Sequence, residues 1–111
     1  MSTHDEVVRA VAAAHRDEWR RVMAATVRTT RDLDLAEESV QDAYEAALVQ
    51  WETEGVPRNP GAWLTTTAKR RALDTIRRAA TLRSKLPLLV YPDSRPEPYT
   101  SRPEPVEGPT T

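Results

Sequence analysis

Carboxylate and amide side chains recur at short helical spacing between residues 35 and 48. Glu38 lies on one side of a predicted helix here. At about 100° per residue, Gln41, Asp42 and Glu45 all fall within about 60° of it. Exposed helix faces usually pair opposite charges at i and i+4, whereas this one sets acid beside acid. A face of a single sign predicts a basic binding partner, and the alternative is a solvated helix face.

A second group of residues brings cations, hydroxyls and an aromatic ring to one broad face of the segment 60–79. Cations neutralise phosphates, hydroxyls position a nucleic-acid backbone, and an aromatic ring can stack on an unpaired base. The members of this face are Trp63, Thr66, Thr67, Arg70, Arg71, Arg77 and Arg78. We therefore expect a nucleic-acid contact. The alternative makes Trp63 a core residue of a helical bundle and leaves the arginines as solvated surface residues.

The patterns typical of enzymes and metal sites are missing from the sequence. There is no cysteine, and His4 and His15 are too far apart in the sequence to form a metal-binding pair. The chain also lacks a glycine-rich phosphate loop, a nucleophile elbow and an HExxH motif. We expect no enzymatic activity, no metal, no cofactor and no small-molecule substrate. His15 lies on an apolar helix stripe, where a packed imidazole is expected rather than a ligand.

Three long helices are predicted to position these residues, because the apolar residues follow helical spacing rather than alternation. The first spans residues 5–30, and its expected inward stripe is Val8, Val11, Ala12, His15, Trp19, Val22 and Met23. The second is capped by Asp32 or Asp34, ends near Trp51 and buries Ala36, Val40, Ala43, Ala47 and Trp51. The third follows an Asn59 cap with Pro60 at its first position and ends near Ala79. Its expected core stripe is Leu64, Ala68, Ala72, Thr75, Ile76 and Ala79.

The predicted fold class is a small all-α helical bundle with three long helices, room for a short fourth before Pro87, and a Pro-rich tail. Seven of the nine prolines fall between Pro87 and Pro109, and the sequence SRPEP occurs twice there. Proline blocks both helix and central strand. We expect a helical domain at residues 1–90 and a disordered tail at residues 91–111. Because the core is thin and rich in alanine, marginal stability is expected.

The net charge of −1 hides a segregation of charge along the chain. Residues 1–55 carry −6, residues 56–87 carry +7 and residues 88–111 carry −2. An acidic part and a basic part favour two partners of opposite charge. No run reaches the ~18–20 apolar residues that cross a bilayer, and the N-terminus lacks the pattern of a signal peptide. We therefore expect no membrane association and a cytoplasmic location.

Three segments, in order and at matching spacing, resemble region 2 of the sigma-70 family of RNA polymerase sigma factors. They are LAEESVQDAYEAAL (35–48), WETEGVPRNPGAWL (51–64) and AKRRALDTIRR (68–78). Within the family, the extracytoplasmic-function (ECF) group is the most similar, and GVPRNPGAWL and RSKLPLL resemble a subgroup with a large C-terminal extension. The resemblance covers about residues 5–90. It implies a bacterial transcription initiation protein that acts in the cytoplasm, at the nucleoid.

The resemblance also implies roles for individual residues. In the family, an acid-x-x-Gln-acid motif docks on the basic clamp helices of the β′ subunit of core RNA polymerase. Here the motif is Glu38, Gln41 and Asp42, with Glu38 where Asp is usual, and Glu45 lies on the same face. The third helix and the loop before it contact the minus-ten promoter element and trap unstacked bases of the non-template single strand. The matching residues are Arg58 and Asn59 of the 55–59 loop, Trp63, Thr66, Lys69, Arg70 and the 74–78 stretch.

Two further expectations concern partners and completeness. An anti-sigma factor is another candidate partner. Region 4, which reads the minus-thirty-five element in the family, has no counterpart in residues 88–111. The alternatives to an initiation factor are therefore a truncated sigma-like module that occupies the polymerase clamp without productive initiation, or an inert gene remnant.

Overall fold

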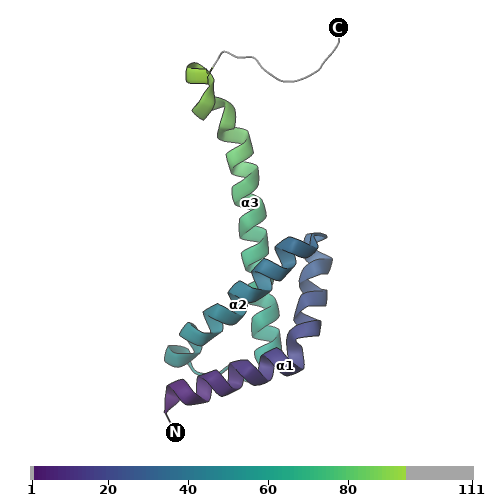
Figure 1. Ribbon diagram of the computed structural model, residues 1–111, viewed down its shortest axis with the longest axis vertical. Helices are drawn as coiled ribbons and strands as arrows, with labels where there is room; N and C mark the ends of the chain where they lie inside the picture. The colour runs from purple at the N-terminus through teal and green to yellow at the C-terminus, as the bar shows by residue number, and fades with distance from the viewer. Residues whose placement is uncertain (1, 95–111) are drawn as a thin grey trace. The chain divides into compact units, whose positions relative to one another are not determined.

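The computed structural model describes residues 2–94, and the surroundings of the side chains for residues 2–88. Within these residues it contains three helices and no strand: α1 (Thr3–Thr30), α2 (Leu33–Glu54) and α3 (Pro60–Ser94) (Figure 1). This confirms the all-α fold class with three long helices. The chain divides into two compact units, one ending at Ile76 and the other beginning at Arg77, so the boundary falls inside α3. The packed core belongs to the first unit.

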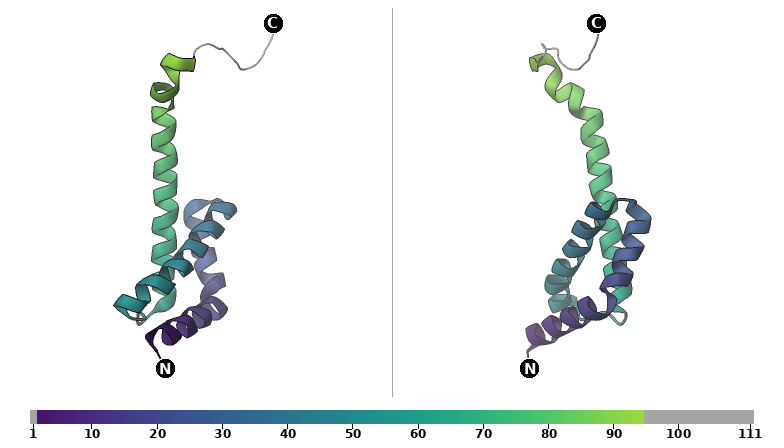
Figure 2. Two further views of the ribbon diagram at one scale, coloured as in Figure 1. Left: turned by 60° about the vertical axis from the view of Figure 1, so that its left-hand side comes forward. Right: turned by 45° about the vertical axis from the view of Figure 1, so that its right-hand side comes forward.

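Local capping chemistry explains where α1 and α2 begin and end. The Ser2 hydroxyl accepts a hydrogen bond from the Asp5 amide at 3.1 Å, which satisfies one of the free donors in the first turn of α1. Arg31 ends α1 in the left-handed conformation, with φ at 56°. Asp32 caps α2, as predicted, by accepting from the Leu35 amide at 3.0 Å. The short connection makes α1 and α2 a helical hairpin (Figure 2).

The loop between α2 and α3 is also built from capping residues. Helix α2 runs to Glu54, slightly beyond its expected end near Trp51, and Gly55 follows with φ at 89°, a conformation that favours glycine. The Asn59 side chain accepts from the Ala62 amide at 3.1 Å and its carbonyl accepts from Trp63, so Asn59 caps α3 as predicted.

The core of the first unit lies where the apolar sides of α1, α2 and the beginning of α3 meet. Helix α2 contributes the stripe predicted from sequence, which is fully confirmed. From α3, Leu64 and Ala68 join the core, and Ala72 is also buried. The core residues are Val7, Val11, Ala14, Val22, Val40, Ala43, Tyr44, Ala47, Trp51, Leu64 and Ala68. Most are small, which agrees with the expectation of a thin core.

The inward face of α1 differs from the predicted stripe in its first half. Val8 and Ala12 are exposed, whereas Val7 and Ala14 are buried. Alanine and valine occupy both sides of this segment, so the apolar pattern alone did not define the face. Figure 1 shows that α1 is bent near its middle, so that its two halves follow different directions. A single straight stripe therefore describes only the half that contains Val22.

Helix α3 is longer than predicted and its buried stripe is shorter. The helix continues past Ala79 to Ser94, so the segment assigned to a short fourth helix belongs to α3. Alanine, leucine, arginine and lysine dominate residues 77–86, and all are strong helix formers. Thr75, Ile76 and Ala79, which were expected in the core, are exposed. The first four residues of the predicted tail, 91–94, lie in α3, and residues 95–111 lie outside the described residues.

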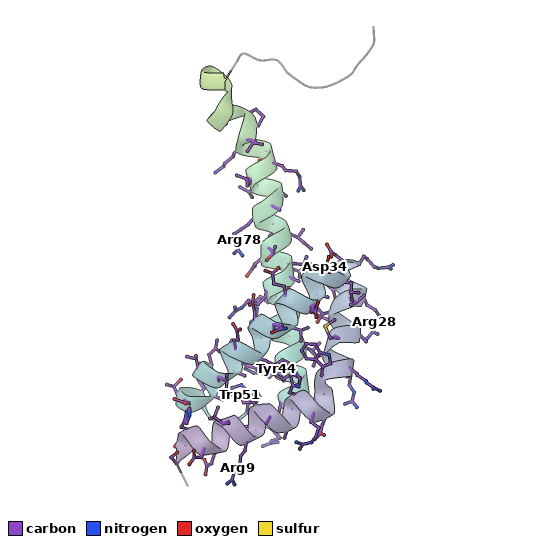
Figure 3. All side chains as sticks on the ribbon, in the orientation of Figure 1. Arg9, Arg28, Asp34, Tyr44, Trp51 and Arg78 are labelled. Atoms are coloured by element: carbon purple, nitrogen blue, oxygen red, sulfur yellow. The ribbon has the colours of Figure 1, made fainter. Side chains whose placement is uncertain are left out.

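An aromatic cluster joins α1 to α2. The ring centroid of His15 lies 4.8 Å from that of Trp19 and 5.2 Å from that of Tyr44. The Tyr44 hydroxyl donates a hydrogen bond to the Ala14 carbonyl at 3.0 Å. Figure 3 places Tyr44 and Trp51 on the side of α2 that faces α1. His15 therefore packs against other rings, as the sequence suggested, but it is exposed, so its expected place on the inward stripe of α1 is wrong.

Candidate functional site

The acidic face predicted on α2 is open to solvent. Glu38, Gln41 and Glu45 are exposed and Asp42 is half-buried. Trp51 and the alanines and valine of the opposite stripe are fully buried. A shallow depression on this face is lined by Asp34, Glu37, Glu38, Gln41 and Asp42. The capping of α2 by Asp32 and the burial of its apolar stripe hold these side chains outward.

The carboxylates of this acidic face are not neutralised within the described part of the chain. Ion pairs join His4 to Glu52, Arg16 to Asp17 and Arg21 to Glu18, and no residue of the acidic face takes part in an ion pair within the described residues. Acidic neighbours at i and i+4, such as Glu38 and Asp42, repel each other by a few tenths of a kcal/mol. A basic partner would remove that repulsion and gain attraction. The arrangement is suited to binding rather than to folding.

The basic residues of α3 are divided between the two units. In the first unit Thr66, Arg70 and Arg71 are exposed, and Lys69 is half-buried. In the second unit Arg77 and Arg78 are exposed. Arg70, Arg71 and Arg78 are open to a phosphate from solvent.

Thr67 and Trp63, which were also predicted to contact nucleic acid, are less exposed than these arginines. Thr67 is buried, with 8% of its surface exposed, because it lies on the side of α3 that packs with Leu64 and Ala68. The expectation that Thr67 shares an open face with Thr66 is therefore wrong. Trp63 is half-buried and packs against the core, with its ring 5.3 Å from that of Trp51 at an interplanar angle of 72°. This geometry supports the core role of Trp63, and base stacking by its exposed part stays a prediction.

The loop before α3 presents Arg58 and Asn59. Both residues are exposed. The Asn59 oxygen Oδ1 is engaged in capping α3, so the free part of its amide group is the nitrogen, a hydrogen-bond donor. Arg58 adds a positive charge at the same place. The loop therefore offers donors to an acceptor such as a phosphate or a base edge.

Sequence reasoning overlooked α1 as a part of this surface. Arg21 and Arg28, seven residues apart on α1, line a groove together with Asn59, Thr65 and Thr66. Counting charge by segment concealed them, since α1 belongs to the acidic part of the chain. The signal that could have found them is their spacing, because residues seven apart lie on the same side of a helix.

Comparison with known proteins identifies the family. A family model for sigma-70 region 2 matches residues 9–81, which is more than half of the chain. The chain belongs to the sigma-70 region 2 family. The two faces described above lie within the matched residues.

A curated relative gives no further functional detail. The sigma region 2 chain is 45% identical over 56 residues to an uncharacterized protein of Rhizobium meliloti (strain 1021), a match that covers 50% of this chain and 13% of the relative. The matched segment is thus a small part of a much longer protein. No solved structure matches the chain. Among the described residues, no helix is long and apolar enough to span a membrane, and no acidic and histidine side chains gather as a metal site.

Proposed function

We propose that this sigma region 2 protein is of the ECF type and initiates transcription by docking on the basic β′ clamp helices of core RNA polymerase. The docking surface is the acidic face of α2, formed by Glu38, Gln41, Asp42 and Glu45. The observation that carries the proposal is the set of exposed carboxylates without an ion pair in the described residues. Charge complementarity across an interface speeds association and fixes its register.

The second part of the proposal concerns promoter DNA. Cationic and polar residues of α3 and of the loop before it contact the minus-ten element, and the exposed part of Trp63 borders that contact. These residues are Arg58, Asn59, Thr66, Lys69, Arg70, Arg71, Arg77 and Arg78. The exposure of the arginines and of Thr66 supports this assignment. Arginine and lysine contacts to phosphate give affinity, and unstacked bases of the non-template strand supply selectivity. The chain makes and breaks no covalent bond in this role, and we assign its action to the cytoplasm.

Run-off transcription with core polymerase tests the function. If the chain starts transcripts from a promoter, the initiation role holds. If it starts none but suppresses transcription by an added sigma factor, the chain occupies the clamp without productive initiation. If it has neither effect, both roles are contradicted, as expected for an inert remnant. Asp42→Lys should abolish whichever effect the wild type has. Glu54→Lys makes an equal charge change on another side of α2 and is the matched control.

A further inference from the structure

A groove runs between the C-terminal half of α1 and the first turns of α3, within the first unit. Its volume is about 390 Å³. Arg21 and Arg28 line it from α1, and Asn59, Thr65 and Thr66 line it from the α3 side. Asn59 and Thr66 are already assigned to DNA. The groove therefore connects the proposed DNA surface of α3 to two arginines of α1 that the resemblance did not include.

Glu18 and Gly61 determine how closely the two walls of the groove approach. A Cβ atom at Gly61 would lie 2.6 Å from the Glu18 carboxylate oxygen Oε1, so the carboxylate occupies the space that a side chain would fill. The same oxygen accepts a hydrogen bond from Arg21 Nη1 at 3.0 Å. Glu18 thus neutralises Arg21 and holds it against the groove.

Arg28 differs from Arg21 because it has no ion pair among the described residues. It is exposed in the last turn of α1, where its charge is also favourable for the helix dipole. Its position near that end of α1 can be followed in Figure 3. An unneutralised guanidinium facing hydroxyl and amide groups across a groove is a donor set that suits a phosphate.

We propose that this groove holds the sugar–phosphate backbone of the single-stranded DNA, with Arg28 as a phosphate-binding residue and Thr65 and Thr66 as hydrogen-bond donors. This inference rests on the proposed DNA-binding function and extends it to α1. Arg21 is a second cation that becomes available when its bond to Glu18 is released. Because phosphate contacts carry no sequence information, the groove positions the strand and leaves base selection to the loop and α3.

The test is binding of the full chain to two fluorescent single strands, one with bases and one with abasic sugars, over a range of salt concentrations. Arg28→Ala should weaken binding about three- to fivefold at low salt and reduce the salt slope by about 0.7, equally for both strands. Arg28→Lys keeps the charge and should keep the slope. Arg9→Ala is the matched control, since Arg9 projects from the side of α1 away from α2 and does not line the groove (Figure 3).

Glu18→Gln provides a gain-of-function arm, since it frees Arg21 without changing the size of the side chain. It should raise affinity and steepen the salt slope. If the wild type binds DNA but Arg28→Ala behaves like Arg9→Ala, the groove assignment is overturned while the DNA function stands. An equal loss on the strand with bases and on the abasic strand in Arg28→Ala would support the groove, and an effect confined to the strand with bases would overturn it. If the wild type binds neither strand, the DNA function and the groove both fail.

Discussion

The hydroxyl of Tyr44 on α2 donates a hydrogen bond to the carbonyl oxygen of Ala14 on α1, at 3.0 Å. Both residues are buried, and the bond spans 30 positions in the sequence. It fixes the rotation of α2 about its own axis against α1. Because Asp42 and Glu45 flank Tyr44, the same bond helps to set the direction in which the acidic face points.

Tyr44→Phe should lower the free energy of unfolding by about 1 kcal/mol, since it removes one buried hydrogen bond and keeps the ring. Burial, with a smaller contribution from Glu18, raises the pKa of Tyr44 to about 12 from its ordinary value of 10.0. The stability that depends on the neutral hydroxyl is complete below the unfolded pKa and is lost as pH rises from about 10 to 12. Over that range the wild type should lose roughly 2 to 3 kcal/mol relative to Tyr44→Phe. Urea unfolding of both proteins at about pH 7 and pH 12 checks this, and a constant difference would contradict it.

His4 near the start of α1 pairs with Glu52 near the end of α2. The hydrogen bond and charge of Glu52 raise the pKa of His4 above 6.5. Stability from this pair is therefore fully present below 6.5 and is lost as pH rises through the raised pKa. His4→Ala should melt at a lower temperature than the wild type in acid, and the two should converge at alkaline pH. Melting curves across this range test the pair, and Glu52→Gln should reproduce the effect.

The thin core predicts a large penalty at its few bulky residues. Leu64 is fully buried, so Leu64→Ala should cost about 2 to 5 kcal/mol, most of the stability of a small domain. Leu73, on the same helix and 40% exposed, is the matched control, and Leu73→Ala should cost less than about 1 kcal/mol. Denaturant unfolding separates the two. Similar losses would mean that Leu64 does not belong to the core.

The DNA surface of α3 predicts a salt-dependent contact at Arg70. Arg70→Ala should weaken binding to a single strand of minus-ten sequence and lower the salt slope by about 0.7, the effect of one lost phosphate contact. Arg20→Ala, an exposed arginine of α1, is the control for net charge. Titrations at several salt concentrations measure the slope. An unchanged slope in Arg70→Ala would remove α3 from the footprint.

Helix α2 was predictable because its two sides differ strongly in polarity. Every position expected to be buried, from Ala36 to Trp51, is buried. The buried face in the first half of α1 was not predictable from the sequence. Val7 and Val8 have the same side chain, and only the packing partner decides which one turns inward. Thr67 shows the same limit on α3, where helical spacing placed it on the polar face but packing beside Leu64 and Ala68 buries it.

The groove at Arg28 could not be predicted from the sequence for a different reason. It depends on α1 and α3 approaching closely at Gly61, and that approach joins residues more than thirty positions apart. The C-terminal limit of α3 was also missed. Proline at position 87 indicated an end, but the helix continues through it with the loss of one backbone donor.

The most direct test of the central claim is the affinity of the full chain for core RNA polymerase after charge reversal on α2. Glu38→Lys combined with Asp42→Lys should weaken binding by tenfold or more and slow association, because both charges would then repel a basic surface. Glu54→Lys combined with Glu6→Lys serves as the control, since it makes the same total charge change at two exposed residues outside the acidic face, and it should bind much more tightly than the reversal. Equal affinity of the reversed and wild-type chains would contradict docking through the acidic face of α2.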